Sequence, residues 1–134
     1  MALIKSISGI RGTIGGKVNE NLTPIDAVKF AAAYGMWLKE QNANESLTII
    51  LGRDARISGK MVSSLVANTL IGLGINVVDL GLSTTPTVEV AVTLENADGG
   101  IIITASHNPK QWNALKLLNN KGEFLNAAEG EKIL

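Results

Sequence analysis

From position 99 the chain reads Gly99-Gly100-Ile101-Ile102-Ile103-Thr104-Ala105-Ser106-His107-Asn108-Pro109. Its first five residues are apolar and uncharged, which is typical of a short buried strand. Pro109 favours an extended conformation at Asn108 and prevents a helix from beginning earlier. Such a strand should therefore end in a polar loop that places the hydroxyl of Ser106 beside the imidazole of His107, at the rim of a sheet.

On both sides of this stretch, short apolar strands alternate with amphipathic helices. Thr23-Pro24 and Thr85-Pro86 each have the pattern of an N-cap followed by proline in the first helical turn. Strands are expected over residues 3–8, 47–51, 75–80, 99–103 and 114–118, and helices over 24–41, 61–73 and 86–94. The alternation predicts an α/β fold: a single three-layer domain over residues 1–134, with a mostly parallel mixed sheet and helices on both faces.

The expected elements also have predicted faces and ends. The helix over 24–41 should turn an apolar stripe toward the sheet, formed by Ile25, Val28, Ala32, Trp37 and Leu38. The segment 88–94 has valines at alternating positions and so also fits a strand, but the cap at its start and the strand that follows favour a crossover helix. Gly74 should end the second helix, residues 119–122 should form a turn, and Asn126 should cap a further helix.

Composition excludes several classes of function. The 134 residues are 46% hydrophobic and 18% charged, and 12 basic residues balance 12 acidic ones, so nothing favours nucleic acid or an anionic membrane as a partner. No apolar run reaches the roughly 20 residues that span a bilayer, and no secretory signal is evident, so we expect a cytoplasmic protein. With no cysteine and one histidine, any metal should be held by oxygen ligands.

Polar residues follow the expected strands. In open α/β sheets ligands bind beyond the carboxyl ends of the strands, and here the loops at Gly9, Gly52, Ser83 and Thr104 should converge. They would bring together groups suited to an anion, namely Arg11, Arg53, Arg56, Ser106, His107 and Lys116. Each has an ordinary alternative, since loop serines usually serve turns and Arg53-Asp54-Ala55-Arg56 fits a solvated ion-pair cluster. No serine-hydrolase elbow, dinucleotide fingerprint or Walker motif is present.

Four segments of the sequence are informative when their order and spacing are taken together. They are Ser8-Gly9-Ile10-Arg11-Gly12, Gly52-Arg53-Asp54-Ala55-Arg56-Ile57-Ser58-Gly59, Thr84-Thr85-Pro86-Thr87, and Asp98-Gly99-Gly100 continuing to Ser106-His107-Asn108-Pro109. In this order and spacing they resemble the N-terminal domain of the α-D-phosphohexomutase family, the phosphoglucomutase and phosphomannomutase enzymes. The resemblance covers nearly the whole chain, and the Ser106 string is the most specific.

The resemblance implies an isomerase that interconverts hexose 1-phosphate and hexose 6-phosphate through a hexose 1,6-bisphosphate. It implies that Ser106 carries the phosphoryl group and binds Mg²⁺, that Lys116 transfers a proton, and that Arg11 stabilises charge. His107 and Asn108 would arrange the substrate side of the loop. Phosphoryl transfer is catalysed mainly by positioning and by cations, so these residue types suit the reaction.

Two departures from the family pattern bear on the prediction. Where family members have Asn-Gly-x-Lys, this chain has Asn113-Ala114-Leu115-Lys116. Family enzymes have four domains, so the chain corresponds to the first of them, and its expected partners include the other three. As a fragment it is expected to lack turnover and to self-associate through a bared interdomain surface. The alternatives are a non-catalytic sugar-phosphate or phosphate-binding module, and a structural or regulatory domain.

Overall fold

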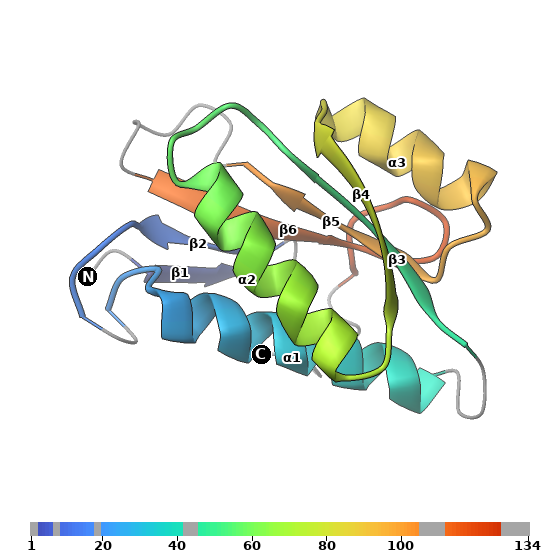
Figure 1. The fold of residues 1–134 in the computed structure, drawn as a ribbon, viewed down its shortest axis with the longest axis horizontal. Helices are drawn as coiled ribbons and strands as arrows, with labels where there is room; N and C mark the ends of the chain where they lie inside the picture. The colour runs from blue at the N-terminus through green and yellow to red at the C-terminus, as the bar shows by residue number, and fades with distance from the viewer. Residues whose placement is uncertain (1–2, 7–8, 18–19, 42–45, 105–111, 127–134) are drawn as a thin grey trace.

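The computed structural model describes residues 3–6, 9–17, 20–41, 46–104 and 112–126. Its elements run β1 (Leu3–Ser6), β2 (Gly9–Thr13), α1 (Pro24–Gln41), β3 (Thr48–Arg53), α2 (Gly59–Gly72), β4 (Asn76–Leu82), α3 (Thr85–Leu94), β5 (Gly99–Ile103) and β6 (Trp112–Leu118). The strands form one six-stranded sheet in the order β1-β2-β6-β5-β3-β4. Helices α1 and α2 cover one face and α3 covers the other, which confirms the predicted three-layer α/β architecture (Figure 1).

The sheet is mixed, as predicted, but its antiparallel part is larger than expected. Strands β5, β3 and β4 are parallel, whereas β1–β2, β2–β6 and β6–β5 are antiparallel pairs. The difference arises because residues 9–13 form β2 and not the predicted loop. This glycine-containing segment has weak strand propensity of its own, and its conformation is stabilised by pairing with both β1 and β6.

Gly9 makes the close pairing of β2 with β6 possible. It lies in register with Lys116 and has a φ of +156°. A Cβ at this position would collide with the Leu115 carbonyl oxygen and lie 2.9 Å from the Lys116 Cα. Gly9, which was expected in a loop, therefore permits a close approach between two strands.

The larger core lies between the sheet and helices α1 and α2. Trp37 and Leu38 are buried in it as predicted, but the expected stripe is wrong at Ile25 and Val28, which are 61% and 37% exposed. The buried face of α1 instead carries Asp26, Ala27, Phe30, Ala31 and Tyr34. Ala27, Phe30, Ala31, Tyr34 and Leu38 recur at three- and four-residue spacing, so they form a regular apolar face that is rotated from the predicted stripe.

Capping contacts account for the helix ends. Thr23 Oγ1 donates to Asp26 Oδ2 at 2.6 Å, and the Asp26 backbone N–H faces Thr23 Oγ1 at 3.4 Å, so the two residues close the start of α1 as a reciprocal cap. Helix α3 begins one residue earlier than predicted: Thr84 is its N-cap, and its Oγ1 accepts from the Thr87 N–H at 3.3 Å. Gly74, with a φ of +82°, follows the end of α2 as expected.

The valines of α3 have helical and not strand geometry. Val88 and Val92, four residues apart, are fully buried against β3 and β5, while Val90 is 53% exposed. This spacing confirms the crossover helix and excludes the strand alternative for these residues. Among the described helices, we find none with the length and hydropathy that a bilayer crossing requires.

Tyr34 on α1 joins the helix layer to the sheet. Its hydroxyl is fully buried, donates to the Leu118 carbonyl at 2.5 Å and accepts from the Gly100 N–H at 3.0 Å. The Tyr34→Phe variant should lower the free energy of unfolding by about 1–3 kcal/mol, because both backbone groups would remain buried without this partner. Urea unfolding measures the change. As a control, Thr93→Ala removes an exposed hydroxyl and should change stability by less than about 0.5 kcal/mol.

Candidate functional site

Four polar side chains gather on the α3 face of the sheet, near the carboxyl ends of β3 and β5. Lys116 on β6 lies in register with Ile102, which packs beneath α3, so strand alternation places both residues on this face. Arg11 on β2 pairs with Ala114, two residues before Lys116, and so shares the same face. Asp54 and Thr104, directly after β3 and β5, complete the group.

Asp54 is the centre of the hydrogen-bond network. Its Oδ2 accepts from Thr104 Oγ1 at 2.6 Å and from Arg56 Nε at 3.2 Å, and its Oδ1 accepts from the Arg56 backbone N–H at 3.1 Å. The Arg56 side chain is only 13% exposed. A shielded ion pair with these additional bonds should contribute more than an isolated surface pair, which is worth about 0–1 kcal/mol.

The same network holds both ends of the segment 105–111, which contains Ser106. On the amino side, Thr104 is bound by Asp54, and its N–H donates to the Ala114 carbonyl at 3.1 Å. On the carboxyl side, Arg56 Nη1 donates to the Trp112 carbonyl at 3.2 Å. We call these contacts the Asp54–Arg56 clamp. The clamp fixes where the chain enters and leaves the serine segment relative to Lys116.

Lys116 has an altered proton affinity. Burial is the main cause that lowers its pKa below the ordinary value, and the nearby positive charge of Arg11 lowers it further, while Asp54 acts in the opposite direction. A lysine in this environment holds its proton less tightly than a surface lysine. It is therefore better suited to accept a proton from a hydroxyl group and return it later.

The Lys116→Met variant should raise the melting temperature near pH 7, because it removes a charge whose burial and repulsion by Arg11 disfavour the folded state. In the wild type this destabilisation falls as the pH rises from the folded-state pKa of Lys116 toward 10.5, the ordinary lysine pKa that applies to the unfolded chain. In that pH range the folded chain has released the proton and the unfolded chain still binds it, so the folded state gains stability with rising pH. The difference between variant and wild type should therefore narrow with rising pH. Melting curves at a series of pH values, with the exposed Lys121→Met as control, measure this. A constant difference would contradict it.

The structure brings together only part of the predicted site. Arg11, Arg56 and Lys116 lie in or beside the clamp, although Arg11 is on a strand and not in a loop. Arg53 does not join them, because it shares the opposite face of β3 with Leu51 and Ile49, which pack beneath α1 and α2. The predicted residues Ser106, His107 and Asn108 lie outside the described residues, as does the helix expected after Asn126.

Asp54 and Thr104 were not predicted as site residues. The sequence offers a solvated ion pair as the ordinary role of Asp54, and it places Thr104 at the start of a loop without giving its side chain a role. Their signal was present in the sequence, since both directly follow a parallel strand of the same sheet, where side chains from neighbouring strands meet. Loss of the Asp54 carboxylate or of the Thr104 hydroxyl would remove the side-chain hydrogen bond on the amino side of the clamp.

The described residues do not by themselves form a metal site. No group of three or more histidine, aspartate or glutamate side chains is close enough to hold an ion in this part of the chain. The Asp54 carboxylate, which faces Thr104, accepts from Thr104 and Arg56.

Comparison with known proteins yields one family. Residues 3–134 match the model described as "Phosphoglucomutase/phosphomannomutase, alpha/beta/alpha domain I". The chain is 42% identical over 113 residues to a phosphoglucomutase/phosphomannomutase of Thermococcus kodakarensis, covering 83% of this chain and 25% of the relative. It is 38% identical over 125 residues to a phosphoglucosamine mutase of Ligilactobacillus salivarius, covering 93% of this chain and 27% of that protein.

Solved structures agree on the fold. A crystal structure of a Thermus thermophilus protein that carries the name phosphomannomutase superposes with a TM-score of 0.87 at 29% identity, covering 99% of this chain and 30% of that one. A phosphoglucomutase/phosphomannomutase family protein from Burkholderia thailandensis gives a TM-score of 0.77 at 24% identity, over 97% of this chain and 30% of the other. This chain thus spans about a quarter to a third of the length of these proteins.

Proposed function

Because the chain belongs to the phosphoglucomutase/phosphomannomutase family, as its domain I, we propose that it is the phosphoserine domain of an isomerase that interconverts hexose 1-phosphate and hexose 6-phosphate. The observation that carries the proposal is the position of Lys116. An amine of lowered pKa lies on the same face as the Asp54–Arg56 clamp, which holds both ends of the segment that contains Ser106. A proton-transfer group and a hydroxyl nucleophile are the parts that stepwise phosphoryl exchange requires.

In the proposed reaction Ser106 carries the phosphoryl group between turnovers. A hydroxyl of hexose 1-phosphate attacks that phosphorus, the bond from phosphorus to Ser106 Oγ breaks, and hexose 1,6-bisphosphate forms. Lys116 accepts the proton that the attacking hydroxyl loses and donates a proton to the departing Ser106 Oγ. In the second half the Ser106 hydroxyl gives its proton to Lys116 as Oγ takes the phosphoryl group from position 1, and Lys116 donates a proton to the departing sugar oxygen. Each half-reaction exchanges one P–O bond for another, so no further reactant is needed.

Charge and substrate contacts complete the proposal. Arg11 is exposed on the Lys116 face, where its guanidinium can approach the phosphoryl oxygens. Burial is the main cause of the lowered pKa of Lys116, and the charge of Arg11 adds to it. His107 and Asn108, beside Ser106 in the sequence, would orient the sugar phosphate. We propose Mg²⁺ as the cofactor, with Ser106 as its ligand from this chain and carboxylates from outside residues 1–134 as the others. The remaining domains of the family are then obligatory partners.

Separate assays of the chain and of a chimera test this function. Alone, the chain should show no interconversion of glucose 1-phosphate and glucose 6-phosphate, because each missing electrostatic partner costs several kcal/mol at the transition state. Joined to the remaining domains of the Thermococcus kodakarensis relative in place of its matching segment, it should give turnover and a phosphoserine at position 106 in peptide mass spectra. A chimera that folds, binds glucose 6-phosphate and never acquires phosphate would favour the non-catalytic binding module. Sedimentation of the free chain tests its self-association.

A further inference from the structure

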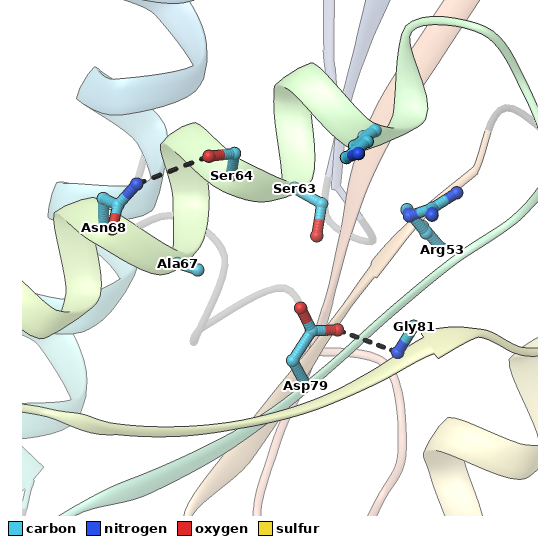
Figure 2. A pocket seen from close by; sticks show the side chains of 8 residues that line it. Arg53, Ser63, Ser64, Ala67, Asn68, Asp79 and Gly81 are labelled. Carbon is cyan, nitrogen blue, oxygen red and sulfur yellow. Dashed lines mark hydrogen bonds between the residues drawn. The ribbon is translucent and has the colours of Figure 1, made fainter.

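A second polar pocket lies on the other face of the sheet, between α2 and the edge formed by β3 and β4. Its volume is about 280 Å³, and it is lined by Arg53, Lys60, Ser63, Ser64, Ala67, Asn68, Asp79 and Gly81. Arg53 comes from the end of β3 and Asp79 from β4, while the serines come from the first half of α2 (Figure 2). Strand alternation separates it from the Lys116 cluster, because Arg53 and its neighbour Asp54 point to opposite faces.

The charges that line the pocket are not neutralised within the described part of the chain. Neither Arg53 nor Lys60 forms an ion pair there, and the one hydrogen bond of the Arg53 guanidinium is a long contact of 3.4 Å to the Asp54 carbonyl. Asp79 uses one carboxylate oxygen to accept from the Gly81 N–H at 2.8 Å. The pocket thus offers two cations at one end and a carboxylate with a further accepting oxygen.

Ser63 adds a hydroxyl group to the lining of the pocket. This residue is only 5% exposed, its hydroxyl points into the pocket toward the side where Asp79 lies, and among the described residues it has no hydrogen-bond partner (Figure 2). Alanine would be the better helix former at this position, and no hydrogen bond of the described fold requires the hydroxyl. Ser63 Oγ is therefore available to exchange hydrogen bonds with a ligand in the pocket.

We propose that this pocket binds a small phosphorylated polyol. The phosphate would lie between Arg53 and Lys60, and neighbouring hydroxyl groups would donate to Asp79 and exchange hydrogen bonds with Ser63. A bare anion suits the pocket less well because Asp79 repels it, and an uncharged polyol leaves both cations unmatched. The volume, just under the usual lower limit of about 300 Å³ for ligand sites, restricts the occupant to a compact molecule.

Titrations followed by amide chemical shifts test the proposal on the 134-residue chain. Glycerol 3-phosphate should shift the amides of residues 60–64 and 79–81 in a saturable way, with the Gly81 N–H reporting directly on Asp79. Inorganic phosphate should bind more weakly at the same residues, and glycerol should leave them unchanged at equal concentration. Shifts confined to Thr104, Lys116 and their neighbours would place the phosphate at the proposed catalytic face and overturn this inference.

Three variants separate binding from folding. Ser63→Ala should unfold at the same or a higher temperature and yet bind glycerol 3-phosphate several-fold more weakly, because it loses a hydroxyl that the fold does not use. Arg53→Gln should weaken binding about tenfold or more. Asp79→Asn should remove the preference for glycerol 3-phosphate over inorganic phosphate. The surface variant Lys121→Gln, with the same change in charge as Arg53→Gln, should bind as the wild type does. Undiminished binding by Ser63→Ala or Arg53→Gln would refute the site.

Discussion

Ser106→Ala should abolish the mutase activity of the chimera described above, lowering kcat by at least about 10⁴-fold, since no other hydroxyl can take its place as the carrier of the phosphoryl group. The variant should also contain no phosphoserine in this domain. Both results follow from the same cause, because without Ser106 Oγ the P–O bond that stores the phosphoryl group between half-reactions cannot form. Coupled assay of glucose 6-phosphate formation and intact-mass measurement provide the two readouts.

Ser83→Ala is the matched control for this variant. Ser83 follows β4 at the same end of the sheet, and among the described residues its hydroxyl donates a hydrogen bond only to the Gly81 carbonyl, at 3.3 Å. Its loss should leave kcat and phosphoserine content within twofold of the parent. Turnover that survives in Ser106→Ala, with phosphate found on another residue, would show that the phosphoryl carrier has been assigned to the wrong side chain.

Lys116→Met should lower kcat of the chimera by about 10²–10⁴-fold, the usual range for loss of a general acid–base group. The pH dependence should change as well. Because the lowered pKa makes the neutral amine available at a lower pH than for an ordinary lysine, kcat of the parent should rise with pH as Lys116 loses its proton, and the variant should lose this rise. Steady-state rates at a series of pH values measure both effects.

Two further variants distinguish proton transfer by Lys116 from a role as a fixed positive charge. Lys116→Arg keeps the positive charge but cannot lose a proton, so it should be nearly as impaired as Lys116→Met. Lys121→Met removes a lysine that is exposed in the turn after β6 and should leave kcat unchanged. Recovery of most activity in Lys116→Arg would mean that Lys116 acts as a fixed charge, and the proposed role in proton transfer would be wrong.

The helices could be predicted because local signals determine them. Thr23-Pro24 with Asp26 marks the start of α1, and Gly74 marks the end of α2 through a backbone conformation that other residues rarely adopt. The rotation of α1 was predicted wrongly, although Ala27, Phe30, Ala31 and Leu38 have the apolar spacing of the face that is buried. The contacts of the Tyr34 hydroxyl could not be predicted locally, because they reach backbone groups 66 and 84 residues away in the sequence.

Long-range pairing also explains what was missed in the site. Strand β2 was predicted as a loop because its conformation depends on β6, about a hundred residues later in the chain. Arg53 and Asp54 were assigned to one cluster, although the alternation of a strand already implied that they lie on opposite faces. The pattern of strand ends predicts Lys116 as one of the groups suited to an anion, and only its role in proton transfer comes from the family resemblance. The structure places Lys116 beside Arg11 even though Ala114 stands where family members have glycine.

The Asp54–Arg56 clamp should make the segment with the proposed nucleophile exchangeable. Hydrogen bonds to the Ala114 carbonyl and to the residues after β3 hold Thr104 and Trp112, so the two ends of residues 105–111 are positioned by the scaffold. We expect replacement of residues 105–111 by segments of equal length from related enzymes to change the melting temperature little. Directed evolution around the proposed nucleophile could then proceed in a seven-residue cassette, without having to preserve the fold at the same time.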